Sequence, residues 1–362
     1  MKNKYPVKIL QLVAVLAIAA SSCKKSSTPA PVVDAKPVTI GLFELTNSGN
    51  SRIFIPISKI GTQTVNYDEI FDTGSTGFTI DAAGIVPASM ITSTGFNITA
   101  GDSIVTGGIT ITSHTSTMSY GNKTSSTTEY GNLAYASITI PDEAGSGVTI
   151  KRVPMFLYYK IVDQNNKSLT AHSGDIFGVG PGVSYTNSSI ASPLSYYSPG
   201  TGLTNGFKLA TLVSADFTSG GTYVEGLLTL GLTSADLNSS GFIMHPLSIT
   251  NPGGYSPDIP GTITYGGNTI SAQLLFDTGT PSVTIIEDKT ASIGELPQNT
   301  VVTVTTNKGF TYTYTTTDTN NLTEVQNPNN TGDFRSIFSI DFFVENEFLT
   351  NYAGHQIGLK NN

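Results

Sequence analysis

Short runs in which apolar and polar residues alternate make up most of the chain from Val38 onward. Such runs include 39–43, 109–112, 136–140 and 302–305. A period of two is typical of β-strands, because successive side chains of a strand point to opposite faces. The runs are separated by Gly, Asn and Pro, and only 234–237 and 340–349 have helix-like patterns. The pattern therefore predicts an all-β protein with many strands, suited to two barrel-like lobes.

The composition narrows the class of function. The chain has 362 residues, enough for a large core divided between two lobes. Its net charge is −8 and the body of the chain has no basic cluster, so we expect no nucleic-acid partner. The four histidines are scattered and form no metal-binding motif, so we expect neither a metal nor another cofactor.

The N-terminus has the pattern of a targeting segment. Three lysines precede the apolar run 9–20, which is short for a membrane span and is followed by Ala20-Ser21-Ser22-Cys23. We interpret 1–22 as a lipoprotein signal peptide, Cys23 as the lipid attachment site and 23–37 as a disordered tether. This predicts a lipid-anchored protein of the bacterial cell envelope, on the outer membrane and facing the periplasm or the surface. The alternative is an ordinary secretory signal that is cleaved nearby.

One tetrapeptide occurs twice, 205 residues apart. Phe71-Asp72-Thr73-Gly74 returns as Phe276-Asp277-Thr278-Gly279, and each copy closes a strand-like run. An Asp at the end of a buried strand is unstable unless hydrogen bonds hold its carboxylate. Two such carboxylates on matching loops indicate a pair that shares a proton and activates a water. A turn role for each Asp is the alternative, because Asp-x-Gly is a common turn sequence.

The two loops, continued as Asp-Thr-Gly-Ser-Thr and Asp-Thr-Gly-Thr-Pro, resemble the active-site loops of pepsin-like aspartic peptidases. The resemblance extends over about residues 38 to 360, in the same order. Its other segments are the hairpin before Phe71, Ser119-Tyr120-Gly121 as the flap, 175–180 behind the first loop, 226–236 at the start of the second lobe, and 341–343 with 355–359 at the C-terminus.

The resemblance implies a bilobal pepsin-like fold with a cleft between an N-terminal lobe (38–198) and a C-terminal lobe (199–362). It also implies a monomeric aspartic endopeptidase that hydrolyses polypeptides. Each site residue then has an implied role: Asp72 and Asp277 are catalytic, Thr73 and Thr278 join the loops, Gly74 and Gly279 let them turn tightly, Ser75 and Thr280 donate hydroxyls to the carboxylates, and Tyr120 covers the cleft.

Three features depart from the family pattern. The chain has no Trp, and Thr79 stands where relatives often have one to pair with the flap Tyr. The second lobe has only 64 residues from Asp277 to Asp341, and Ile340 stands where we expect a Gly. Both catalytic loops are intact, which favours the enzyme, but these departures leave an alternative open, a catalytically inactive pepsin-fold protein that binds a protein or glycan partner in its cleft.

Overall fold

The computed structural model describes residues 35–121, 126–250 and 254–362. Residues 35–362 form one compact unit. The expected signal peptide, Cys23 and most of the tether lie outside the described residues. The predictions made for them therefore stay predictions.

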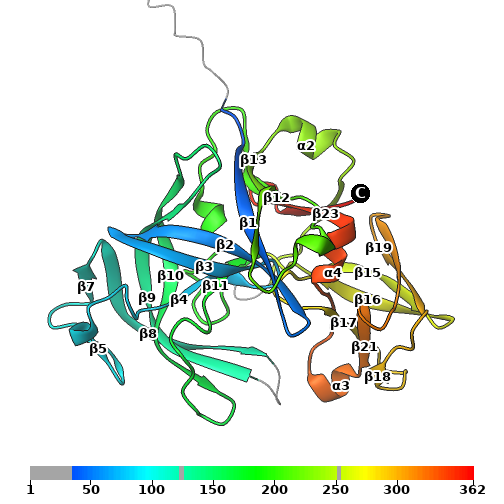
Figure 1. The fold of residues 1–362 in the computed structure, drawn as a ribbon, viewed down its shortest axis with the longest axis horizontal. Coiled ribbons are helices and arrows are strands. Elements are labelled where there is room, and N and C mark those ends of the chain that lie inside the picture. Colours follow the sequence, from blue (N-terminus) through cyan, green and yellow to red (C-terminus); the bar gives the residue numbers. More distant parts are fainter. Residues whose placement is uncertain (1–34, 122–125, 251–253) are drawn as a thin grey trace, which may run out of the picture. The chain divides into compact units, whose positions relative to one another are not determined.

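A fourteen-stranded sheet contains the strands of the N-terminal half, except for the separate pair β5 and β6, and several strands from the C-terminal half (Figure 1). Its strand order is β14-β24-β23-β12-β13-β1-β2-β3-β11-β4-β10-β9-β8-β7. The bounds are β1 (Val38–Asn47), β2 (Asn50–Ile60), β3 (Gln63–Asp72), β4 (Thr76–Asp81), β7 (Ser103–Thr106), β8 (Ile109–Gly121), β9 (Ser126–Ile140), β10 (Val148–Asp163), β11 (Ile176–Val179), β12 (Thr204–Leu209), β13 (Thr222–Leu232), β14 (Ile243–Pro246), β23 (Asn346–Asn351) and β24 (Gln356–Asn361).

The second large sheet has eight strands and lies wholly within the C-terminal half, in the order β18-β21-β17-β22-β16-β15-β19-β20. Its bounds are β15 (Ile259–Tyr265), β16 (Asn268–Phe276), β17 (Val283–Glu287), β18 (Gly294–Glu295), β19 (Val301–Thr306), β20 (Thr311–Thr315), β21 (Leu322–Gln326) and β22 (Arg335–Phe338). The remaining elements are β5 (Ile91–Thr92), β6 (Gly95–Phe96), η1 (Ala88–Met90), η2 (Pro193–Tyr196), η3 (Ser214–Asp216), α2 (Ser234–Asn238), α3 (Pro328–Thr331) and α4 (Ile340–Glu345).

The prediction of an all-β chain is confirmed, with one helix shorter than expected. The helical pattern of 340–349 ends at Glu345, because β23 begins at Asn346 and pairs with both β12 and β24. The predicted lobe boundary between residues 198 and 199 falls between η2 and β12. The fourteen-stranded sheet continues across it, since β12 and β13 lie beside β1.

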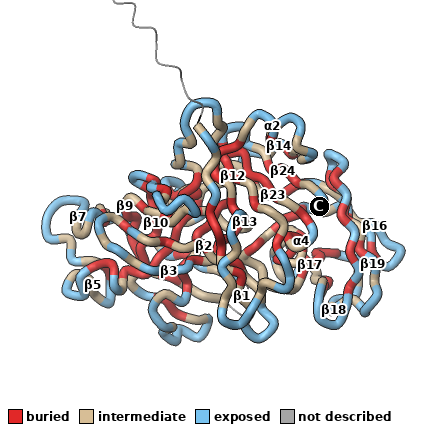
Figure 2. Tube along the Cα trace, turned by 45° about the horizontal axis from the view of Figure 1, so that its top comes forward, coloured by how far each residue is buried: buried red, intermediate tan, exposed pale blue. Residues whose placement is uncertain are grey.

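The core lies behind the two Asp-Thr-Gly loops. Phe71 and Phe276, the residues before each Asp, are 0% and 2% exposed. Phe71 packs edge-on against Phe207, and Phe276 packs against Phe342 of α4 at 4.2 Å between ring centroids. Figure 2 shows that buried residues run through β1, β2, β12 and β13, while the loops at the periphery are exposed. Burial of these aromatic rings fixes the ends of β3 and β16, and with them the positions of the two loops.

Candidate active site

The two Asp-Thr-Gly loops meet face to face, so that each carboxyl group lies against the glycine of the other loop. A Cβ atom added to Gly74 would lie 2.3 Å from Cγ of Asp277, and one added to Gly279 would lie 2.6 Å from Cγ of Asp72. Neither glycine has a positive φ. The space that the opposite carboxyl group occupies therefore requires a glycine at each position, and the backbone N–H of each glycine is turned toward the carboxylate of its own loop.

Each carboxylate is held by hydrogen bonds from its own loop. Oδ1 of Asp72 accepts from the backbone N–H groups of Gly74 (2.8 Å) and Ser75 (2.9 Å), and Oδ2 accepts from the Ser75 hydroxyl (2.6 Å). Asp277 repeats two of these bonds, with Gly279 N–H on Oδ1 (2.8 Å) and the Thr280 hydroxyl on Oδ2 (2.6 Å), while the Thr280 N–H donates to the backbone carbonyl of Asp277 (3.3 Å). The hydroxyl contacts are those that the resemblance implies for Ser75 and Thr280.

Two buried threonines join the loops to each other. The Thr73 N–H donates to the Thr278 hydroxyl and the Thr278 N–H donates to the Thr73 hydroxyl, both at 3.0 Å. The hydroxyls then donate onward to backbone carbonyls, Thr73 to Phe276 (2.8 Å) and Thr278 to Phe71 (2.6 Å). These reciprocal hydrogen bonds fix the distance between the loops, because each threonine belongs to one loop and is bound to backbone groups of the other.

A strand behind the first loop supports Asp72. β11 runs parallel to β3 and antiparallel to β4, which places Gly178 beside Asp72. A Cβ atom at Gly178 would lie 2.8 Å from the carbonyl oxygen of Gly77. The close approach of these backbones explains why the segment 175–180 has Gly at position 178.

The second loop has a matching support with one difference. Asp277 N–H donates to the carbonyl of Phe338 (2.9 Å), and Phe338 pairs with Phe276 in parallel register. The residue that follows, Ser339, therefore occupies the place that Gly holds in the first lobe. The sequence alignment that put Ile340 there is displaced by one residue, and Ile340 is instead a buried residue at the start of α4.

The pKa of Asp72 is raised to about 8. Burial is the largest cause, and the charge and hydrogen bonding of Asp277 add to it, while the bonds from Ser75 act in the opposite direction. Two carboxyl groups in contact cannot both ionise, so one of them retains a proton. The arrangement can therefore present one acid and one base to a ligand at the same pH.

Tyr120 lies on the hairpin of β8 and β9, next to a cleft of about 290 Å³. The residues that line the cleft include Gly74, Ser75 and residues 118–121 of this hairpin. Residues 122–125, which follow β8 in the sequence, lie outside the described residues. The cleft is also lined by residues that no sequence motif predicted, among them Ser184, Tyr255, Asp258 and Arg335.

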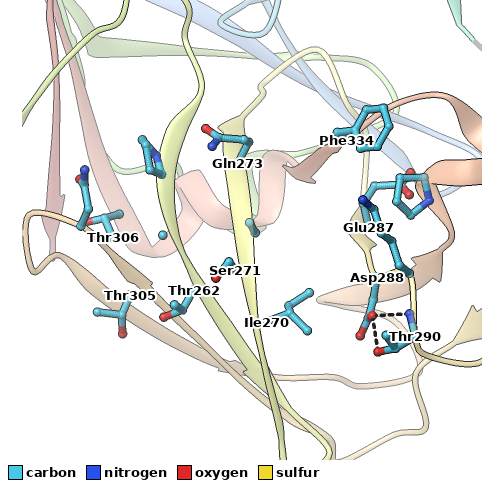
Figure 3. Close-up of a pocket in the computed structure, with 16 residues that line it drawn as sticks. Thr262, Ile270, Ser271, Gln273, Glu287, Asp288, Thr290, Thr305, Thr306 and Phe334 are labelled. Carbon is cyan, nitrogen blue, oxygen red and sulfur yellow. Dashed lines mark hydrogen bonds between the residues drawn. The ribbon is translucent and has the colours of Figure 1, made fainter.

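A larger hollow of about 830 Å³ lies on the eight-stranded sheet (Figure 3). None of its lining residues belongs to an Asp-Thr-Gly loop. Its carboxylate Asp288 accepts bonds from the N–H and hydroxyl of Thr290 (2.7 and 2.8 Å) and from the Tyr265 hydroxyl (2.6 Å). Although burial opposes the change, these bonds lower the pKa of Asp288. A carboxylate held ionised in this way is unsuited to share a proton, so we do not assign the reaction to this hollow.

The paired loops, their threonine joint and the two large sheets are those of the pepsin-like fold, and the prediction of this fold is confirmed. An aspartic proteinase from Irpex lacteus matches with a TM-score of 0.58 at 17% identity, covering 90% of this chain and 98% of the other. Basic 7S globulin from soybean matches with a TM-score of 0.56 at 12% identity, covering 90% and 96%. No protein-family model and no curated protein matches the chain. One structural relative is named for a proteinase and the other for a globulin, so the fold alone does not decide between catalysis and binding.

Proposed function

We propose that the protein is an aspartic endopeptidase that hydrolyses polypeptides with a water activated by Asp72 and Asp277. The observation that carries the proposal is the contact of the two carboxyl groups, each oriented by its own loop. The cleft beside them is bordered by a hairpin that can cover an extended chain. An extended polypeptide offers such a cleft both backbone hydrogen bonds and alternating side chains.

In the proposed reaction the ionised carboxylate takes a proton from the water as its oxygen attacks the scissile carbonyl carbon. The protonated carboxyl donates a hydrogen bond, and then its proton, to the carbonyl oxygen. Collapse of the tetrahedral intermediate breaks the C–N bond: the carboxyl that took the water proton gives it to the leaving nitrogen, and one hydroxyl of the intermediate returns a proton to the other carboxylate, which restores the pair. The pair carries one proton in the free enzyme, because burial and contact with Asp277 raise the pKa of Asp72.

The pH dependence follows from that assignment. Below about pH 8 the pair keeps its shared proton, and cleavage requires that the other carboxyl be ionised at the same time. We expect cleavage at mildly acidic pH and a loss of activity as the pH rises past about 8. A peptide library assayed from about pH 3 to 9 measures this profile.

Substitution of either carboxyl tests the proposal. Asp72→Asn and Asp277→Asn should each reduce cleavage by at least about a hundredfold, because an amide is neither the acid nor the base. Asp102→Asn, on an exposed loop, is the matched control and should cleave as the wild type does. Inhibitors of the pepstatin type, which imitate the tetrahedral intermediate, should block cleavage. A folded wild type that cleaves nothing across the library would favour the inactive, cleft-binding alternative.

We also propose that the enzyme is a monomer tethered by lipid on Cys23 to the bacterial envelope. The support is the lysine-flanked apolar run before Cys23 and the polar tether after it. Within residues 35–121, 126–250 and 254–362, no helix is long and apolar enough to cross a membrane.

A further inference from the structure

Both ring nitrogens of His172 contact groups that accept hydrogen bonds. Nδ1 lies 2.6 Å from Oδ2 of Asp175, and Nε2 lies 2.9 Å from the carbonyl oxygen of Ala83. The backbone N–H of His172 also donates to Oδ2 of Asp81, the last residue of β4 (3.1 Å). His172 does not line the cleft beside the Asp-Thr-Gly loops. It therefore joins the turn before β11 to the turn after β4 from outside the cleft.

These contacts determine which form of the ring fits. A neutral imidazole has one N–H donor and one bare nitrogen, which only accepts. The carbonyl of Ala83 also only accepts, so a neutral ring that donates to it turns a bare Nδ1 toward the Asp175 carboxylate. The imidazolium donates at both nitrogens and satisfies both partners. The geometry thus favours the protonated ring.

Asp175 is bonded through its other oxygen to two more elements. Oδ1 accepts from the backbone N–H of Asp81 (2.9 Å) and from the hydroxyl of Tyr158 on β10. The carboxylate thus joins the start of β11 to β4 and β10 as well as to His172.

The charge around the ring acts in the same direction. Asp175 and Asp81 are each 7% exposed. The hydrogen bond with Asp175 is the largest cause that raises the pKa of His172 above 6.5, and the charges of both aspartates add to it, although burial acts in the opposite direction. Tyr67 of β3 packs against the ring, at 4.6 Å between ring centroids.

The other titratable groups around this contact are neutral at mildly acidic pH. Burial is the largest cause that raises the pKa of each, and the groups are Tyr67 and Glu69 of β3, Glu129 of β9 and Tyr158 of β10. For Glu129 the pKa is raised to about 9. A neutral group adds no charge to the contact, so the proton on His172 is what offsets the charge of Asp81 and Asp175.

Asp175 stands directly before the strand that supports Asp72. From Asp175 the chain enters β11, where Gly178 lies beside Asp72. Further on, the N–H of Gly180 donates to the carbonyl of Ser75 (2.8 Å), and the Ser75 hydroxyl donates to Oδ2 of Asp72 (2.6 Å). A displacement at the start of β11 is therefore transmitted to the Asp72 carboxylate through a strand of only four residues.

We propose that His172 is a positioning residue that, as an imidazolium, fixes the start of β11 and with it the carboxylate of Asp72. The part that concerns catalysis rests on the proposed peptidase function. Because His172 acts through Asp72 and not on the substrate, its loss should lower kcat and leave KM nearly unchanged.

Two neutral variants test the catalytic part. His172→Asn keeps a donor near the place of Nδ1, and Asn tolerates the backbone of this position, where φ is 61°. His172→Gln keeps a donor near the place of Nε2. At about pH 5 each should lower kcat about tenfold, the scale of one lost hydrogen bond to a charged group, with KM within about threefold of the wild type. His114→Asn, at an exposed position of β8, is the matched control and should cleave as the wild type does.

Urea unfolding tests the same proposal without a substrate. A histidine whose pKa is raised in the folded state stabilises that state fully below the unfolded value of 6.5, and this contribution is lost as the pH rises through the raised value. His172→Asn should therefore unfold at less urea than the wild type at about pH 5, and the difference should shrink as the pH rises to about 9. The other buried acids titrate in both proteins, so their effects cancel in the comparison.

Asp175→Asn gives a spectroscopic test. An amide can donate to Nδ1, so this variant suits the neutral ring. The ring signals of the histidines are titrated by NMR, and the signal of His172 is identified by its absence from His172→Asn. The pKa of His172 should lie above 6.5 in the wild type and should fall in Asp175→Asn.

Three results would overturn the positioning proposal and leave the peptidase proposal intact. The first is a wild-type kcat for both neutral variants at about pH 5. The second is a difference in unfolding midpoint that stays constant with pH, which would mean that the charge has no part in it. The third is a pKa of His172 at or below 6.5 in the wild type. If the folded wild type cleaves nothing, the peptidase proposal fails, and the unfolding and NMR measurements still decide whether the imidazolium fixes the start of β11.

Discussion

The hydroxyl of Thr278 joins the two halves of the active site, and Thr278→Val tests how much that joint contributes to stability. The residue is 0% exposed. Its hydroxyl accepts from Thr73 N–H (3.0 Å) and donates to the Phe71 carbonyl (2.6 Å). Valine has the same shape and neither function, so the substitution leaves one donor and one acceptor of the first lobe without a partner.

The expected magnitude follows from counting these two groups. A buried polar group left unpaired costs about 1–3 kcal/mol, so the free energy of unfolding should fall by about 2–6 kcal/mol. Thr278→Ser keeps the hydroxyl and should recover most of the loss. Thr269→Val is the matched control, because the Thr269 hydroxyl is exposed and contacts only Thr264 (2.8 Å). The control should change the stability by less than about 0.5 kcal/mol.

Urea unfolding measures the difference. The chain has no Trp and 16 Tyr, so tyrosine fluorescence and far-UV circular dichroism are suitable signals. A fall in midpoint at unchanged slope indicates a change in stability alone. A loss below about 1 kcal/mol for Thr278→Val, or the same loss for Thr278→Ser, would refute the view that this hydroxyl holds the loops together.

Three further predictions concern the site, the pH dependence of stability and the anchor. Gly74→Ala should fold but reduce cleavage at least about a hundredfold, since the added Cβ atom would lie 2.3 Å from Cγ of Asp277. If this variant had the kcat/KM of the wild type, the packing argument would be contradicted. Burial, together with the charge of Asp216, raises the pKa of Glu44 from 4.5 to about 7. The contribution of Glu44 to stability is therefore complete below pH 4.5 and is lost as the pH rises through about 7. The free energy of unfolding falls by about 3 kcal/mol over this range, at about 1.4 kcal/mol per pH unit. In urea unfolding, Glu44→Gln should not show this part of the decline. Identical pH profiles for the variant and the wild type would exclude this contribution of Glu44. Cys23→Ser should move the protein from the membrane fraction to the soluble fraction with its unfolding midpoint unchanged, whereas a soluble wild type would refute lipidation.

The sequence was most informative where a local pattern is repeated. Asp72 and Asp277 could be paired from their identical flanks, and alternation indicated the strands and their buried faces. Alternation does not say which strand lies beside which. The pairing of Val38 with Leu230, which places β13 next to β1, joins residues far apart in the chain and has no local signal.

The buried acids were missed although a signal was present. Glu129 is in phase with Leu133 along β9, and Glu44 is in phase with Leu42 along β1, so each lies on the inward face of its strand. A charged residue at an inward position of an alternating run is the pattern to look for.

The mutual fit of the loops has a consequence for how the protein is made. Asp72 is translated with the first half of the chain, but the space that receives it belongs to Gly279, and α4 and β24 follow later still. A ribosome-bound or partly exported chain therefore has one carboxyl group and no counterpart. The proposed activity would be acquired last, when the final strands are in place. A cell that makes such a peptidase is thus protected from it during synthesis by the order in which the polypeptide is completed.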